Sequence, residues 1–164
     1  MSSRFIHNRG GAPGGAIRNF VASGEVAPDI IGCVFTENSA FLGGAMYSIG
    51  ARPVVINTTF TENDATRGGA VYNVSGARLR LTNAILWGNR AADQGPEIAS
   101  SASAEVILAH TLLEGGLAGI SNESGATTTD NGGILDTDPR FVLVAAPGGL
   151  DDRLGTADDG LRLL

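Results

Sequence analysis

The chain of 164 residues contains no lysine, a single cysteine and few aromatic side chains, which make up 5% of the total. Without lysine, neither Schiff-base chemistry nor a lysine general base is available. One cysteine cannot form an internal disulfide, and we expect Cys33 to be a small core residue. The net charge is −6 and no basic stripe is present, so we expect no nucleic-acid partner.

Long hydrophobic runs are also missing. No stretch approaches the roughly 18 apolar residues of a membrane helix, so we expect this segment not to span a membrane. The N-terminus lacks the basic, hydrophobic and small-residue succession of a signal peptide. Because the repeat described below begins close to the N-terminus and residues 161–164 are leucine except for Arg162, we interpret the chain as a fragment of a longer exported protein.

Glycine is the abundant residue. The chain has 24 glycines, 43% apolar residues and only 17% charged residues, a composition that helical bundles rarely show. Glycine costs backbone entropy unless it occupies a turn or a crowded position that only it can fill. A repetitive β architecture provides many such positions.

One pattern recurs every 25 to 30 residues along most of the chain. It starts with a Phe-x-x-Asn tetrad and continues with a glycine pair, an alanine and an apolar residue. The tetrads are Phe5-Ile6-His7-Asn8, Phe35-Thr36-Glu37-Asn38, Phe60-Thr61-Glu62-Asn63 and the weaker Leu86-Trp87-Gly88-Asn89. The glycine pairs are Gly14-Gly15, Gly43-Gly44 and Gly68-Gly69, with Gln94-Gly95-Pro96-Glu97 as a degenerate fourth.

Apolar residues alternate between these motifs, as in Leu79 and Leu81 and, one repeat later, Val106 and Leu108. Alternation predicts short strands, and no segment sustains a helical period. The sequence therefore predicts an all-β fold, a right-handed parallel β-helix of about five coils, in which each coil pairs with the next about 4.8 Å along the axis. A leucine-rich repeat has a similar period, but it requires a dense leucine pattern that this repeat lacks.

Equivalent residues stack in a β-helix, so each repeated position predicts a column. An inward apolar column is expected from Phe35, Phe60 and Leu86. A ladder of turn amides is expected from Asn38, Asn63 and Asn89. A second ladder is expected from Asn57 and Asn83, with His110 in place of an asparagine. The glycine pairs allow a tight bend or close packing of the coils.

The sequence divides into two parts. Residues 1–120 carry the repeat and are expected to form the coils of the β-helix. Residues 121–164 begin with a polar, glycine-containing stretch, which predicts an irregular final coil followed by an acidic tail.

The pairing of Phe-x-x-Asn with Gly-Gly-Ala-[Ile/Val/Leu] resembles the repeats of polymorphic outer membrane proteins. More broadly, it is similar to the right-handed parallel β-helix repeats of bacterial surface proteins, which share the pectate-lyase-like superfold. The match covers residues 5–98 and continues more weakly to 116. Met46 and the degenerate fourth glycine pair depart from the pattern. The resemblance implies an extracellular or outer-membrane-surface location and an adhesin-like or autotransporter-passenger role.

Glu37 and Glu62 are the strongest candidates for catalysis. They occupy the same repeat position, so their backbones should lie about 5 Å apart, with His7 one coil further along. Such a carboxylate pair can serve a retaining glycosidase or bind calcium. The alternative is that both side chains point outward from a turn and remain solvated. A single column also lacks the opposed geometry that places two carboxyl groups on either side of a sugar.

A β-helix polysaccharide lyase requires acids and a basic residue gathered on one face. Asp64 and Asp93 occupy non-equivalent repeat positions, and Arg67 is aligned with neither in the sequence. The sequence therefore gives no lyase constellation.

The acidic tail is a second candidate metal site. Asp151, Asp152, Asp158 and Asp159 surround a glycine-containing turn and offer the oxygen ligands that Ca²⁺ prefers. The ligand spacing of an EF-hand is absent, and a solvated acidic loop is the alternative. Calcium is the only cofactor that we consider.

We expect a non-enzymatic cell-surface or secreted scaffold that is adhesin-like or polysaccharide-binding, with a polysaccharide or a host or cell-surface ligand as its partner. One alternative is a carbohydrate-active enzyme, either a polysaccharide lyase or a glycoside hydrolase. Another is a structural fragment without independent activity. Unpaired strand edges at both ends of the solenoid predict end-to-end self-association.

Overall fold

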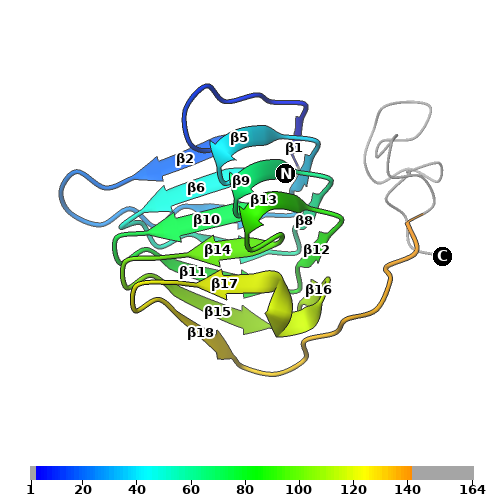
Figure 1. Ribbon diagram of the computed structural model, residues 1–164. Coiled ribbons are helices and arrows are strands. Elements are labelled where there is room, and N and C mark those ends of the chain that lie inside the picture. Colours follow the sequence, from blue (N-terminus) through cyan, green and yellow to red (C-terminus); the bar gives the residue numbers. More distant parts are fainter. Residues whose placement is uncertain (1–2, 142–164) are drawn as a thin grey trace.

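The computed structural model describes residues 3–141, which form a parallel β-helix of about five coils (Figure 1). The predicted all-β solenoid is thus confirmed. Every strand pairs in parallel with the equivalent strand of the next coil, which stacks the strands into four sheets. We number these sheets 1 to 4 in the order in which one coil visits them.

Three of the sheets contain five strands and one contains three. Sheet 1 consists of β1 (Arg4–Ile6), β4 (Val34–Thr36), β8 (Thr59–Thr61), β12 (Ile85–Trp87) and β16 (Leu112–Leu113). Sheet 2 consists of β5 (Ser39–Leu42), β9 (Asp64–Arg67) and β13 (Arg90–Gln94). Sheet 3 consists of β2 (Ile17–Phe20), β6 (Met46–Ile49), β10 (Val71–Val74), β14 (Ile98–Ser100) and β17 (Ile120–Asn122). Sheet 4 consists of β3 (Asp29–Ile31), β7 (Val54–Ile56), β11 (Arg78–Thr82), β15 (Glu105–Ala109) and β18 (Thr127–Asp130).

The last coil is more regular than its composition indicates. Strand β17 pairs with β14 and strand β18 pairs with β15, so regular pairing continues to Asp130, past the expected boundary at residue 120. Most of β18 is exposed, which explains why its sequence is polar. A short 3-10 helix, η1 (Gly116–Gly119), takes the place that a sheet 2 strand has in the preceding coils.

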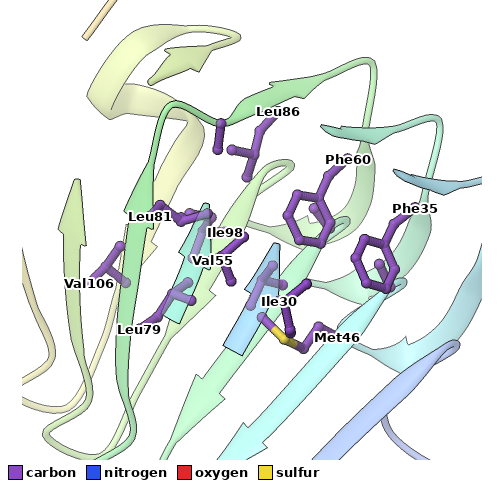
Figure 2. Packing of buried hydrophobic residues seen from close by; sticks show 14 of the residues in the cluster. Ile30, Phe35, Met46, Val55, Phe60, Leu79, Leu81, Leu86, Ile98 and Val106 are labelled. Carbon is purple, nitrogen blue, oxygen red and sulfur yellow. The ribbon is translucent and has the colours of Figure 1, made fainter. Parts of the chain in front are cut away.

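The core is a set of stacked apolar columns inside the coils (Figure 2). In sheet 1, Phe35, Phe60 and Leu86 lie in register and are fully buried, and Phe5 and Leu113 continue the column at its two ends. The ring centroids of Phe35 and Phe60 are 4.8 Å apart, and the angle between the two ring planes is 7°. Phenylalanine therefore recurs because each ring packs against the same residue one coil away.

The second glycine of each pair is required by close packing between coils. A Cβ atom on Gly44 would lie 2.1 Å from the carbonyl oxygen of Gly69, and one on Gly69 would lie 2.2 Å from the carbonyl oxygen of Pro96. No side chain can be accommodated at these distances, so the backbone itself fills the corner between sheets 2 and 3.

The expected second ladder has a different physical basis. Gly32, Asn57, Asn83 and His110 form a column in which each residue has a positive φ, between 50° and 63°. Within residues 3–141, the side-chain amides of Asn57 and Asn83 make no hydrogen bonds. Asparagine recurs there because it tolerates the left-handed conformation that this turn imposes.

Replacing Phe60 with alanine should reduce the free energy of unfolding by about 3 to 5 kcal/mol, because the cavity lies inside a continuous stacked column. The matched control is Phe41→Ala, since Phe41 is 65% exposed on β5. Its effect should stay within about 0.5 kcal/mol. Urea denaturation of both variants measures the difference, and equal losses would contradict the stacked-core assignment.

Candidate functional site

Buried asparagines connect the coils at the turn between sheets 1 and 2. The Asn63 side-chain amide donates to Oδ1 of Asn89 at 2.8 Å and to the carbonyl oxygen of Phe35 at 3.0 Å. The backbone N–H of Asn63 donates to the same Oδ1 at 3.0 Å. Asn38 makes the equivalent bonds one coil earlier, so Asn8, Asn38, Asn63 and Asn89 form one continuous ladder.

The residue before each ladder asparagine points outward from a left-handed turn. His7, Glu37, Glu62 and Gly88 occupy this column, with φ values of 54°, 55°, 53° and 73°. A non-glycine residue pays roughly 1–2 kcal/mol for this conformation. The two glutamates are therefore held at positions where glycine or asparagine would be less strained.

Each of these glutamates contacts a nitrogen-bearing side chain on a neighbouring coil, His7 for Glu37 and Arg90 for Glu62. Oε2 of Glu37 lies 2.5 Å from Nε2 of His7, and Oε2 of Glu62 lies 3.2 Å from a terminal guanidinium nitrogen of Arg90. Both pairs are substantially exposed, so each contributes at most about 1 kcal/mol to stability. Glu37 and Glu62 thus belong to one column, and the side chain of each is directed toward its own partner, His7 or Arg90.

A second polar column lies beside the first, directly after the ladder asparagines. Arg9, Ser39, Asp64 and Arg90 are in register across four coils at the start of sheet 2. The two columns border an open groove of about 610 Å³. It is lined by Arg9, Glu37, Asn38, Ser39, Glu62, Asp64 and Arg90. We call it the polar groove.

The second wall of this groove was not recognised from the sequence. Its members are two arginines, a serine and an aspartate, so the position shows no uniform residue type from one repeat to the next. Only their position in the sequence could have identified them, because each directly follows a ladder asparagine.

Arg67 is in register with Gln94 and not with an acid, but its side chain reaches an acidic partner that the repeat alignment does not show. Nε of Arg67 lies 2.8 Å from Asp93, one coil further on, and a terminal nitrogen lies 3.3 Å from Glu123. Asp64 instead lines the polar groove. The hydrogen bond from Arg67 to Asp93 raises the pKa of the guanidinium, which keeps Arg67 cationic and unsuited to act as a base.

Other expected sites stay predictions. Asp151, Asp152, Asp158 and Asp159 lie outside the described residues. Among residues 3–141, no group of three or more His, Cys, Asp or Glu side chains is arranged to hold a metal ion. In the same part of the chain, no helix has the length and apolarity needed to cross a membrane.

No family model, curated protein or solved structure matches the chain. The resemblance to polymorphic outer membrane protein repeats therefore stays a prediction from the motifs, and the site has to be interpreted from its own geometry.

Replacing Asn63 with glycine should reduce the free energy of unfolding by about 2 kcal/mol or more, because buried donors of Asn38 lose their acceptor. Asn57→Gly is the matched control, because glycine adopts the positive φ of Asn57 without strain. We expect this control to leave stability nearly unchanged. Thermal or urea denaturation compares the two, and a larger loss from Asn57→Gly would contradict the distinction between the two columns.

Proposed function

We propose that this β-helix is a non-enzymatic scaffold, secreted or displayed on the cell surface, that binds a polysaccharide in the polar groove. The proposal rests on one observation, the alignment of the groove's side chains across successive coils. Side chains that carry a carboxylate, a hydroxyl or a guanidinium group occupy equivalent positions on successive coils along its walls. A polymer of hydroxyl-bearing units can donate to the carboxylates and accept from the guanidinium groups at successive coils.

An exposed aromatic ring next to the groove supports a carbohydrate ligand. Phe41 is 65% exposed and lies two residues after Ser39 on β5. Because alternate residues of a strand share a face, Phe41 extends from the same side of the sheet as Ser39. An aromatic face beside polar groups offers an apolar surface to a sugar ring.

Backbone strain supports a role for the groove carboxylates. Glu37 and Glu62 adopt left-handed conformations, whereas Gly88 occupies the same turn one coil later. Strained positions of this kind concentrate at ligand sites. The exposed ion pairs of these glutamates offset little of that strain, which favours a binding role over a structural one.

The arrangement of the carboxylates favours binding over hydrolysis. A glycosidase places two carboxyl groups on either side of the bond that it cleaves. Glu37 and Glu62 instead belong to one column, and each already contacts a side chain of a neighbouring coil, His7 or Arg90. The surface or secreted location rests on the repeat motifs alone.

Arg90→Ala should weaken binding to the polysaccharide at least tenfold, because Arg90 lines the groove and is exposed for contact. The matched control is Arg80→Ala, since Arg80 is exposed on β11 in sheet 4. The protein is screened by affinity electrophoresis against neutral, acidic and amino polysaccharides, and calorimetry then measures the variants on the retained polymer. If no polymer is retained, or if both variants bind equally, the proposal is wrong. Shortened polymer chains after incubation would instead support the enzymatic alternative.

Glu62→Gly separates binding from folding. Glycine relieves the left-handed strain at this position, so the free energy of unfolding should stay unchanged or increase by about 1 kcal/mol. Binding of the polysaccharide should nevertheless be lost. Calorimetry and urea denaturation of the same preparation test both effects, and a destabilised variant with intact binding would give Glu62 a structural role.

A further inference from the structure

Glu97 interrupts the repeat in the fourth coil. It stands where the two preceding coils have Ala45 and Ala70, directly before the inward apolar residue of sheet 3. Its side chain is only 1% exposed. A buried carboxyl group in place of an alanine methyl is costly unless it replaces a hydrogen bond that the fold needs.

The hydrogen bond in question is the last one of the asparagine ladder, which the side-chain amide of Asn89 donates. Each ladder amide donates to the asparagine of the following coil, as Asn63 does to Asn89. In the fifth coil Leu113 is in register with Leu86, so the ladder position falls on Gly116, which has no side chain. Oε2 of Glu97 accepts the hydrogen bond from Nδ2 of Asn89 instead, at 2.6 Å. Glu97 thereby terminates the ladder.

A second carboxyl group lies beside the first. Oε2 of Glu114 accepts a hydrogen bond from the backbone N–H of Gly88 at 2.6 Å, which joins the fifth coil to the fourth. The side chain of Glu114 raises the pKa of Glu97, both through its charge and as a hydrogen-bond partner. Both line a cavity of about 300 Å³ that η1 partly covers.

One oxygen of the pair has no donor. Oε1 of Glu97 is buried and has no hydrogen-bond partner among the described residues. An ionised Glu97 would place a buried negative charge beside Glu114 on the wall of the same cavity, and repulsion between the two carboxylates disfavours that state. A proton on Oε1 removes the repulsion and supplies a donor to Glu114.

We propose that Glu97 and Glu114 share one proton and that this proton clamps the fifth coil, from β16 to β18, onto the fourth. Its loss at alkaline pH leaves a buried negative charge on Glu97 beside Glu114, at the junction of the two coils. The junction is therefore a pH-sensitive point in an otherwise uniform stack.

The electrostatics agree with the geometry. Burial raises the pKa of Glu97 from 4.5 to about 8; hydrogen bonds from Asn89 oppose this increase and the charge of Glu114 adds to it. Glu114, which lines the same cavity, is the charged group beside Glu97. Because the folded state binds the proton more tightly than the unfolded state, the stabilisation is complete below pH 4.5. It is lost progressively as the pH increases to about 8.

Trp87, the only tryptophan, reports on the clamp because it directly precedes Gly88, whose N–H binds Glu114. Its fluorescence should change with a midpoint near pH 8 in the native protein. Glu97→Gln should abolish this change, since glutamine accepts from Asn89, donates to Glu114 and does not titrate. Glu105→Gln in sheet 4 is the control and should retain the change. Hydrogen exchange at the Gly88 amide, corrected for intrinsic rate, should accelerate above the same pH only where Glu97 is present.

A change that persists in Glu97→Gln, or that is absent from the native protein, overturns the proposal. If Glu97→Gln does not fold, carboxyl-carbon NMR of the native protein decides the matter. A Glu97 midpoint near pH 8 supports the shared proton, whereas a midpoint near 4.5 excludes it. None of these measurements involves a polysaccharide, so they are independent of the proposed binding function.

Discussion

The side-chain amides of the asparagine ladder find their partners on neighbouring coils, so no coil satisfies this turn by itself. Asn63 donates to Asn89 in the following coil and to Phe35 in the preceding one. A shift of one residue between coils would leave these buried groups without partners. The ladder therefore sets the register, and the register in turn stacks the Phe35 and Phe60 rings inside and the groove residues outside.

The ladder also has a direction. Each asparagine amide donates a hydrogen bond to the following coil, so the last amide of the ladder requires an acceptor there and not another donor. A carboxylate oxygen of Glu97 meets this requirement. Glu97 thus gives the fifth coil a junction that differs chemically from all those before it. The repeated coils are stabilised by the same contacts at each junction. Glu97 departs from the repeat and places a titratable group at one of these junctions.

Fold and core could be predicted from the sequence because stacking demands the same residue at the same place, as in Phe35 and Phe60. The prediction failed where one residue type serves two purposes. Asn57 recurs because it tolerates a left-handed turn, whereas Asn63 recurs because its amide is bonded on both sides. The groove wall beside Ser39 and the acceptor role of Glu97 leave no repeat, since each depends on which coils happen to be adjacent.

Interchangeable coils make length a variable that evolution can adjust in whole steps. Between Asn38 and Asn63 the chain completes one circuit and presents the same donors and acceptors again. Duplicating such an interior unit would lengthen the groove by one rung while leaving every existing junction intact. Duplicating part of a unit would misalign everything beyond it. Copy number, rather than the redesign of a pocket, is then the simplest route by which this architecture could match ligands of different length.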